Sequence, residues 1–485
     1  MNLALFIPEI VLAATAVLVI LLDLFVRRSG VLRLTSLAGL VAAAGVSIAM
    51  WGSRDTIFNG MLAVDDFALF FKVLLAGTAA IIVLASADYA EKFSRFKGEY
   101  YALILLSTLG MTLMAATTNF IAIYVSLELA SLALYVLAGF LRDRLSTEAS
   151  LKYLLLGAAA SAILLYGMAL VFGTTGTMSL SSIAAAIGGL SLSGVADNPA
   201  LLAGIVLLIA GFGFKIAAVP FHLWVPDVYQ GAPTTVTAYL SVASKAAGFA
   251  VLLRLFYTAF GTPGWLSETW GLIFAVLAAA GMFAGNVAAI PQPNIKRMLG
   301  YSSIAQAGYL LVGLATLGYA SSVSIAGQSG VMFFLAAYAL TNLGAFTAII
   351  MISRGVGSDL IADYAGLGRR SPLLALALTL CLVSLTGIPP AVGFMGKFYI
   401  FSSAVENGLL WLVIIAAVNS VISAYYYLRV VKVMWFDEAP SAEKIPSSPL
   451  PRIALFICCL GVLMFGIIPG WLMRLAEIAA TMIGF

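Results

Sequence analysis

The chain has 485 residues, of which 62% are hydrophobic and only 9% are charged, and its mean hydropathy is +1.08. Soluble domains carry about 25% charged residues, so the composition excludes a soluble enzyme and predicts an integral membrane protein without a separate soluble domain. The small net charge of +4 gives no indication of nucleic-acid binding.

Apolar windows of about 20 residues, the length that crosses a bilayer, predict fourteen spans. We expect them at 4–26, 31–51, 67–88, 100–116, 119–141, 149–174, 200–219, 233–258, 268–290, 297–318, 329–353, 371–388 continuing through a break to 404, 408–431 and 450–474. We expect helices throughout, because lipid tolerates no unpaired backbone groups and the windows lack the alternation of barrel strands. The first window has no basic segment before it and no small-residue cleavage site, so it is predicted to be a retained span.

Basic residues in the connections predict the orientation. The connections after odd-numbered spans carry seventeen lysines and arginines, whereas those after even-numbered spans carry two, Arg54 and Arg254. Basic loops face the cytoplasm, so both termini are expected on the periplasmic side.

Two spans are interrupted by proline and glycine. The segment LLIAGFGFKIAAVPFHLWVPDVYQGAP interrupts span 7, and LVSLTGIPPAVGFMGKFY interrupts span 12. Each broken span is the fourth of a set of five, and matching breaks in two inverted repeats indicate a transport site near the bilayer midplane. The alternative is two unrelated proline kinks. The expected units are an N-terminal three-helix region at 1–99, two inverted five-helix repeats at 100–258 and 268–431, and a C-terminal transmembrane helix at 450–485.

Five ionisable residues lie within predicted spans: Glu128, Lys152, Lys215, Lys245 and Lys397. A charge at the bilayer centre costs roughly 2.5–3.5 kcal/mol even on insertion scales, so these residues are expected to face one another or a hydrated interior. Such a chain of groups is typical of a proton relay. Lys152 lies near the start of its span, and the alternative for it is that it snorkels to the surface.

Glu128 is interpreted as the only carboxylate deep within a span, and therefore as the partner of Lys215. Burial disfavours the charged lysine and a nearby carboxylate restores it, so moving the carboxylate would release a proton. The alternative is a static ion pair that locks two helices. His222, the only histidine, suits a shuttle between Lys215 and Lys245, or is simply a hydrogen-bonded loop residue.

The remaining charges and aromatic residues receive structural interpretations. Glu9, Lys72, Asp65 and Asp66 are expected near the membrane interface, and the run Tyr425–Tyr427 is interpreted mainly as an interfacial anchor. The sequence has no phosphate-binding loop, dinucleotide fingerprint, iron–sulfur cysteine cluster or zinc motif. We therefore expect no cofactor in this chain.

Three long segments resemble one known family. KIAAVPFHLWVPDVYQGAPTTVTAYLSVASK (215–245), NIKRMLGYSSIAQAGYLL (294–311) and GIPPAVGFMGKFY (387–399) resemble the antiporter-like membrane subunits of respiratory complex I. The segment PDVYQGAP is more similar to the corresponding segment of the branch called subunit N than to that of its paralogues L and M. The resemblance covers essentially the whole chain, and implies fourteen helices with two discontinuous ones.

The resemblance also implies roles for individual residues. Glu128 and Lys215 would form the coupling ion pair, Lys245 the central lysine, and Lys397 the terminal group toward the periplasmic outlet, with Lys152 and His222 as auxiliary groups. Many relatives have a histidine where this chain has Gln306, which cannot titrate near neutral pH. FMN, iron–sulfur clusters and quinone would be bound by partner subunits of a hetero-oligomer that includes antiporter-like paralogues and small membrane subunits.

The leading hypothesis is a proton-translocating subunit of an inner-membrane NADH–quinone oxidoreductase that contains no redox centre itself. A subunit of a multi-subunit cation/proton antiporter would share the same helices and lysines. A structural scaffold that has lost pumping is the third hypothesis, which the intact set of Glu128, Lys215, Lys245 and Lys397 disfavours.

Overall fold

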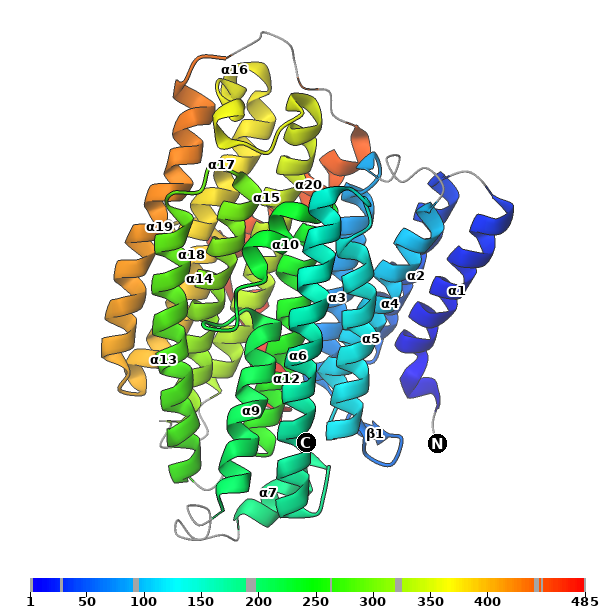
Figure 1. The fold of residues 1–485 in the computed structure, drawn as a ribbon, viewed down its shortest axis with the longest axis vertical. Coiled ribbons are helices and arrows are strands. Elements are labelled where there is room, and N and C mark those ends of the chain that lie inside the picture. The colour runs from blue at the N-terminus through cyan, green and yellow to red at the C-terminus, as the bar shows by residue number, and fades with distance from the viewer. Residues whose placement is uncertain are drawn as a thin grey trace.

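The protein is a bundle of long helices lying roughly side by side (Figure 1). The computed structural model describes residues 3–26, 29–89, 96–188, 198–261, 264–318, 325–439, 445 and 448–483. Five of the basic loop residues that predicted the orientation, namely Arg27, Arg28, Lys92, Arg95 and Lys444, lie outside these ranges.

The described helices agree with the predicted spans. Within the described ranges, thirteen helices are long and apolar enough to cross a membrane. The remaining predicted span is the broken pair α17 and α18, whose halves are each too short to cross alone. The prediction of an all-α polytopic membrane protein with discontinuous helices 7 and 12 is confirmed.

The N-terminal region and the first five-helix set run from residue 7 to residue 258. The elements of the N-terminal region are α1 (Ile7–Phe25), α2 (Ser29–Ala49), β1 (Asp55–Ile57), β2 (Leu62–Val64) and α3 (Asp66–Ala85). The first set contains α4 (Lys97–Ala116), α5 (Phe120–Ala138), α6 (Arg144–Thr175), α7 (Leu180–Gly188), α9 (Pro199–Ile216), α10 (Val225–Gly231), α11 (Thr234–Tyr239) and α12 (Lys245–Thr258).

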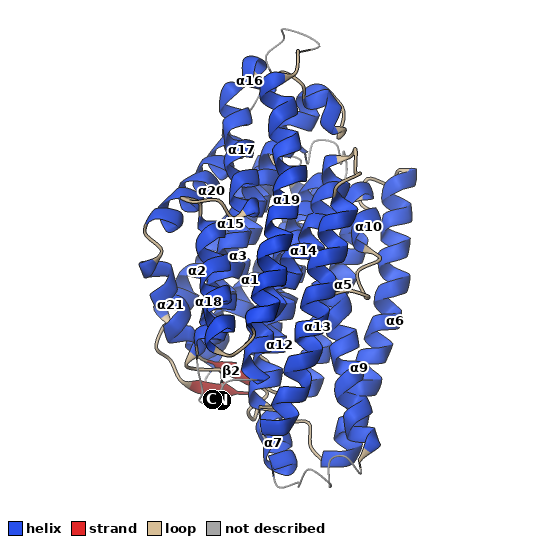
Figure 2. Cartoon of the chain, turned by 90° about the vertical axis from the view of Figure 1, so that its left-hand side faces the viewer, coloured by secondary structure: helices blue, strands red, loops and turns tan. Residues whose placement is uncertain are grey.

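The second five-helix set and the C-terminal segment complete the bundle. They contain α13 (Gly264–Ala289), α14 (Ile295–Ala315), α15 (Ala326–Val356), α16 (Leu367–Arg370), α17 (Pro372–Thr386), α18 (Val392–Glu406), α19 (Leu410–Phe436), α20 (Pro449–Ile467) and α21 (Gly470–Ala480). Both chain ends lie toward the same end of the bundle, and α16 lies at the other (Figures 1 and 2).

The two five-helix sets share a helix cap and a close helix–helix contact at equivalent positions, which two unrelated sets of helices would not be expected to share. Asn119 caps the second helix of the first set, and Asn294 caps the second helix of the other set. A Cβ on Gly110 would lie 2.6 Å from a backbone nitrogen of α5, and one on Gly285 would lie 2.6 Å from a backbone nitrogen of α14. These glycines let each first helix contact the backbone of its successor, and both pairs are 175 residues apart in the sequence.

Both broken spans end their first half in the same way. The residue after α9, Ala217, has φ +63°, and the residue after α17, Gly387, has φ +89°. A left-handed residue terminates an α-helix and frees its last carbonyl groups. Each of the two five-helix sets therefore has, inside the bundle, a helix end whose last carbonyl oxygens are available to groups outside the helix.

Two features differ from the sequence expectations. The hairpin β1–β2 pairs Asp55 with Val64 in antiparallel register, and its turn holds Asn59 and Gly60 at positive φ, as Asn-Gly hairpin turns require. The last predicted span, 450–474, ends earlier: α20 stops at Ile467 and α21 is a separate helix. Pro469 explains the break, because proline disfavours helical geometry in the residue before it.

Candidate functional site

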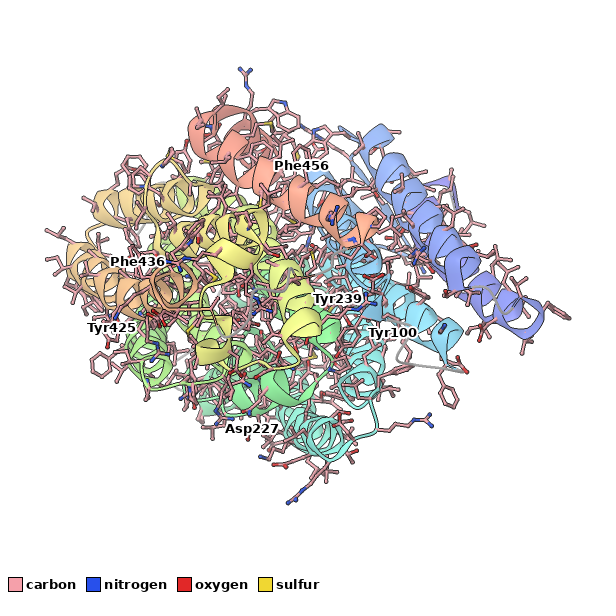
Figure 3. All side chains as sticks on the ribbon, turned by 90° about the horizontal axis from the view of Figure 1, so that it is seen from above. Tyr100, Asp227, Tyr239, Tyr425, Phe436 and Phe456 are labelled. Carbon is pink, nitrogen blue, oxygen red and sulfur yellow. The ribbon has the colours of Figure 1, made fainter. Side chains whose placement is uncertain are left out.

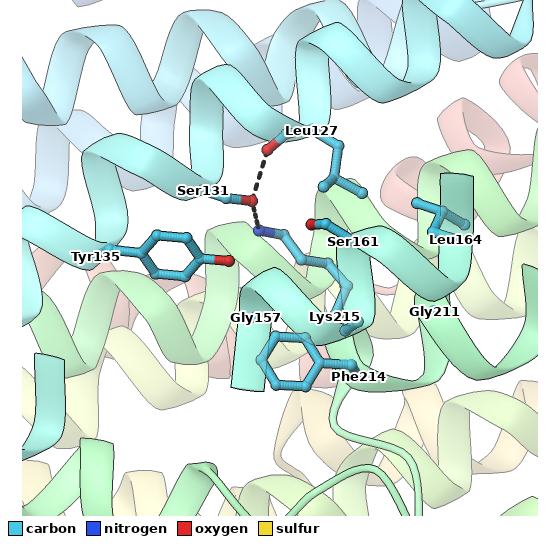
Figure 4. A pocket seen from close by; sticks show the side chains of 10 residues that line it. Leu127, Ser131, Tyr135, Gly157, Ser161, Leu164, Gly211, Phe214 and Lys215 are labelled. Carbon is cyan, nitrogen blue, oxygen red and sulfur yellow. Dashed lines mark hydrogen bonds between the residues drawn. The ribbon is translucent and has the colours of Figure 1, made fainter. Parts of the chain in front are cut away.

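Lys215 lies in the last turn of α9, beside the first break. Its side chain is 3% exposed, and its Nζ donates a hydrogen bond of 2.8 Å to the Oγ of Ser131 on α5 (Figure 4). Glu128 precedes Ser131 by one helical turn, and its buried Oε1 has no hydrogen-bond partner among the described residues. The structure therefore brings Lys215 and Glu128 to the same face of α5 without a direct ion pair.

The space around Lys215 is small. It is a cavity of about 10 Å³, lined by residues that include Ser131, Tyr135 and Ser161. This volume suits a single water molecule. The C-terminal turn of a helix favours a positive charge, and the position of Lys215 at the end of α9 satisfies this condition.

Lys245 begins α12, directly after a π-helical turn formed by Leu240–Ser244. It is 2% exposed, and its Nζ donates to both the backbone oxygen and the Oγ of Ser303 on α14. The hydroxyl groups of Tyr229 and Tyr338 lie 3.1 and 3.0 Å from the same Oγ. Lys245 is thus held by one serine that two buried tyrosines also contact.

The irregular turn before Lys245 is fixed by polar contacts from other helices. The hydroxyl of Tyr239 contacts Thr108 Oγ1 at 2.6 Å on α4, and Asn342 Nδ2 on α15 donates to Ser241 Oγ at 2.6 Å. Figure 3 labels Tyr239 in the interior of the bundle. A π-helical turn changes the direction of the side chains that follow it and often occurs at functional sites, which accounts for how Lys245 points toward α14.

Lys397 lies on α18, after the second break. Its Nζ donates to the freed backbone oxygens of Leu385 (3.2 Å) and Thr386 (2.9 Å) at the end of α17, and to Ser420 Oγ (2.9 Å). It also lies 4.4 Å from the ring centroid of Tyr309, within the range of a cation–π interaction. The C-terminal carbonyls of the broken helix therefore form the binding site for this ammonium group.

Hydrogen bonds connect the surroundings of Lys245 with those of Lys397. Ser302, next to Ser303, shares a short hydrogen bond with the hydroxyl of Tyr427. Gln306 Nε2 donates to that hydroxyl at 3.4 Å and to the Leu385 oxygen at 3.1 Å. Because Lys397 binds the same Leu385 oxygen, polar groups lie along the whole way between the two lysines, with Ser302 and Ser303 joined only as neighbours in the sequence.

This network corrects the interpretation of the tyrosine run. Tyr426 and Tyr427 are fully buried, and Tyr426 donates to Asn286 Oδ1 at 2.9 Å. Only Tyr425 projects outward (62% exposed), as Figure 3 shows. Consecutive residues on a helix point in directions about 100° apart, so a run of three cannot all lie on one interface.

A large cavity adjoins Lys397 on the side of the chain termini. Its volume is about 540 Å³, and its lining includes Lys397, Ser402, Glu406 and Ser420. Glu406 follows Lys397 by nine residues on α18, a distance of roughly 13 Å along a helix. The cavity therefore extends from the buried amine toward the exposed end of the helix.

Lys152 and His222 lie outside the buried series. Lys152 is 41% exposed and forms ion pairs with Glu148 (2.8 Å) and Asp227 (2.6 Å). Asp227 also pairs with Arg297 at 2.6 Å, and Figure 3 labels Asp227 near the rim of the bundle. His222 lies in the turn between α9 and α10, half-buried, and its Nδ1 has no hydrogen-bond partner within the described ranges.

Glu9 and Lys72, which were expected within reach of the membrane interface, are buried instead. Glu9 and Lys72 form an ion pair at 2.7 Å with side chains only 1% and 3% exposed. Glu9 and Lys72 lie near helix ends, but side chains of neighbouring helices pack over them. Hydropathy windows contain no information about contacts between helices, so they could not predict this burial.

Asp65 and Arg254 form a second ion pair that was not expected. Two hydrogen bonds of 2.8 Å join them, with both side chains 2% exposed. Arg254 also stacks 4.7 Å from the ring of Phe67. This pair ties α3 to α12, and it places Arg254 within the bundle instead of in a loop.

Three buried lysines, Lys215, Lys245 and Lys397, thus lie beside breaks or irregular turns of a membrane-length helix bundle. Among the described residues, none of them forms an ion pair with a carboxylate, and neutral oxygens bind each amine. No group of three or more His, Cys, Asp or Glu side chains in the described part of the chain is arranged to hold a metal ion. Such a fold and site define an ion-translocating membrane subunit of the antiporter type.

Comparisons with known proteins agree with this class. Residues 117–423 match the model of the family described as NADH:quinone oxidoreductase/Mrp antiporter, TM, and the chain belongs to this family. The NADH-quinone oxidoreductase subunit N of Dehalococcoides mccartyi is 53% identical over 482 residues, covering 99% of both chains.

Two solved structures are similar over almost the whole chain. A chain of respiratory complex I from Thermus thermophilus with bound aureothin is 34% identical with a TM-score of 0.82, covering 97% of this chain and 99% of that chain. A chain of the Mrp complex from Dietzia sp. DQ12-45-1b has a TM-score of 0.85 at 21% identity, covering 100% and 98%, which shows a common fold alone.

Proposed function

We propose that this chain is the proton-translocating subunit N of a NADH–quinone oxidoreductase. The observation that carries the proposal is the series of polar groups from Lys245 through Gln306 to Lys397, which lies between two buried amines that have no carboxylate counter-ion within the described ranges. An unpaired buried ammonium is costly, so such lysines are suited to exchange protons. The sequence similarity to subunit N relatives supports the rest of the assignment.

In the proposed mechanism, Glu128 and Lys215 respond to the redox partners. When Glu128 approaches, its negative charge stabilises protonated Lys215. When it withdraws, Lys215 transfers its proton toward Lys245. The contact with Ser131 is the resting position of the amine in this scheme, because a hydroxyl can hold either protonation state.

The proton then moves from Lys245 to Lys397. Ser302, Tyr427 and Gln306 supply the polar contacts, with Gln306 orienting groups instead of titrating. Lys397 is the proposed terminal group, and the cavity that reaches Glu406 supports an outlet on the side of the chain termini. His222 and Lys152 act as auxiliary groups: His222 at the first break, and Lys152 through its ion pairs with Glu148 and Asp227.

The two proposed repeats, 100–258 and 268–431, each contribute one broken helix to this path. The region 1–99 and the segment 450–485 cover them from outside. We propose that both termini are on the periplasmic side, because basic connections face the cytoplasm and Arg369 and Arg370 belong to α16, at the end of the bundle far from the termini (Figure 1).

The redox chemistry is assigned to other subunits. FMN, iron–sulfur clusters and quinone are proposed to bind there, so no residue of this chain is given a role in electron transfer. The partners are the other membrane subunits of the complex in the bacterial inner membrane, including antiporter-like paralogues and small subunits. The signal that moves Glu128 would pass through these contacts.

A subunit of a multi-subunit cation/proton antiporter is the alternative, since the family description includes Mrp antiporters. The two functions differ in their partners. Neighbouring genes for flavin and iron–sulfur subunits favour the oxidoreductase, and a cluster of small antiporter subunits favours the exchanger.

The test is Lys245→Ala in the assembled complex, reconstituted in vesicles. We expect the number of protons pumped per electron pair to fall, with Lys432→Ala as the control, because Lys432 is an exposed lysine on α19. Pumping at the wild-type ratio in Lys245→Ala would reject the relay. Sodium-driven exchange without any quinone reduction would favour the alternative function.

A further inference from the structure

Tyr153, on α6, is a buried tyrosine that the mechanism described so far does not use. Its side chain is fully buried, and its hydroxyl has no hydrogen-bond partner among the described residues. Burying a hydroxyl group without a partner is costly, so its position calls for a functional reason. The transfer from Lys215 to Lys245 also has no assigned carrier, because His222, which was expected there, lies half-buried in the turn between α9 and α10.

On one side, Tyr153 contacts Tyr135, which lines the cavity of Lys215. The ring centroids of the two tyrosines are 4.7 Å apart, and the ring planes are at 88° to each other. Tyr135 lies one turn after Ser131 on α5 and its hydroxyl interacts with that serine. Figure 4 shows the same hydroxyl directed toward the amine of Lys215. A Cβ on Gly157 would overlap the Tyr135 hydroxyl, so this glycine of α6 leaves the space that the hydroxyl occupies.

On the other side, Tyr153 faces the groups around Lys245. Its hydroxyl interacts with Ser244, the residue before Lys245, without the geometry of a direct hydrogen bond. The Ser244 Oγ is likewise buried without a hydrogen-bond partner in the described part of the chain. Tyr153 also interacts with Tyr229, whose hydroxyl lies 3.1 Å from the Ser303 Oγ that binds Lys245. Two buried hydroxyl groups without partners are therefore neighbours, and one belongs to the residue next to the central lysine.

The first break holds the ring of Tyr153 in place. The indole of Trp224 stacks on this ring, with centroids 4.5 Å apart and planes inclined by 17°. The Trp224 Nε1 donates a hydrogen bond of 3.0 Å to the backbone oxygen of Phe214, in the last turn of α9. Because Phe214 precedes Lys215, the helix end that carries the first amine is linked directly to the position of the tyrosine.

We propose that Tyr153 carries the proton from Lys215 to Lys245, an inference that rests on the proposed function of the chain. The hydroxyl accepts a proton that arrives from protonated Lys215 through Tyr135, and releases its own proton through Ser244 to neutral Lys245. One O–H bond forms while another breaks, so the tyrosine is neutral before and after the step and the positive charge passes from one amine to the other. A hydroxyl group suits this role because it both donates and accepts.

The test uses the assembled complex in vesicles and counts the protons pumped per electron pair. Tyr153→Phe keeps the ring and its stacking but removes the hydroxyl, and we expect the ratio to fall to that of Lys245→Ala. Tyr101→Phe is the matched control and should pump at the wild-type ratio. The hydroxyl of Tyr101 is also buried without a hydrogen-bond partner within the described ranges, but its ring packs against Tyr100 on α4.

A more acidic hydroxyl at the same position separates proton transfer from packing. Difluorotyrosine in place of Tyr153 retains the hydroxyl and should restore the wild-type ratio. Its maximal pumping rate should differ from that of the wild type, because rates of proton transfer follow the acidity of the group involved. A hydroxyl that only fills space would give the same rate in both proteins.

The outcomes distinguish this inference from the function on which it rests. If Lys245→Ala loses pumping, then a wild-type ratio in Tyr153→Phe, an equal loss in Tyr101→Phe, or a wild-type rate with difluorotyrosine would each overturn the role of Tyr153 alone. A wild-type ratio in Lys245→Ala would reject the proposed function, and this inference with it.

Discussion

The Nζ of Lys215 is bound by the Oγ of Ser131 at 2.8 Å, and Ser131 lies one turn beyond Glu128 on the same helix. In the proposed mechanism the amine moves between this neutral oxygen and the charged oxygen of Glu128. A hydrogen bond with a charged partner contributes roughly 1.5–3 kcal/mol. In that scheme the hydroxyl competes with the carboxylate for the same amine.

The first prediction concerns this competition. Ser131→Ala removes the neutral partner, so Lys215 should remain with Glu128 and release its proton less readily. We expect proton pumping to slow by roughly tenfold, the effect of about 1.4 kcal/mol, while the complex still assembles. Ser126→Ala is the control on the same helix, because the hydrogen bond of Lys215 goes to Ser131 and not to Ser126. The measurement is proton uptake by vesicles during NADH oxidation, and an unaltered rate in Ser131→Ala would contradict the proposal.

A second prediction tests the connection between Lys245 and Lys397. Tyr427→Phe keeps the buried ring but removes the hydroxyl that joins Ser302 to Gln306. We expect about a fivefold slower pumping rate, as the loss of one hydrogen bond of roughly 1 kcal/mol implies.

Tyr364→Phe provides the control for this prediction. Tyr364 is equally buried, but its hydroxyl contacts Ser353 Oγ at 2.9 Å instead of a member of the series. Pumping should therefore be near the wild-type rate in Tyr364→Phe. If the two variants lose pumping to the same extent, the effect is on packing and not on the connection.

A third prediction concerns stability and the buried pair of Asp65 and Arg254. Asp65→Asn retains the cap of α3, which asparagine can also provide, but it leaves Arg254 as an uncompensated buried charge. We expect the free energy of unfolding to fall by about 3–5 kcal/mol. The combined change Asp65→Asn/Arg254→Met should recover most of the lost free energy of unfolding, because it also removes the buried positive charge of Arg254.

Thermal unfolding of the detergent-solubilised complex, monitored by loss of this subunit from the assembly, measures both variants. Lys432→Met on the exposed part of α19 is the control for replacing a basic residue. A double variant as unstable as Asp65→Asn alone would show that the charge of Arg254 is not the cause.

The sequence predicted the number and type of the spans well, because both depend on local properties. Hydropathy marks each span, and the glycine and proline residues around Ala217 and Gly387 mark the breaks that the structure has. The hairpin before α3 had a usable signal, Asn59-Gly60, that the hydropathy windows did not register. The end of α20 before Pro469 could likewise have been predicted from the proline.

The contacts of the buried amines could not be predicted in this way. Lys245 binds Ser303, 58 residues later, and Gln306 meets Leu385, 79 residues later. The sequence by itself determined that these charges enter the membrane and that two helices break beside them. Only the tertiary structure decided that Ser131, Ser303 and the carbonyl groups of α17 accept hydrogen bonds from the buried amines. It also decided that Glu9 and Asp65 are buried in ion pairs. The physical reason is that helix formation and hydropathy act over a few neighbouring residues, whereas a side-chain partner depends on how helices distant in the sequence rotate and pack against one another.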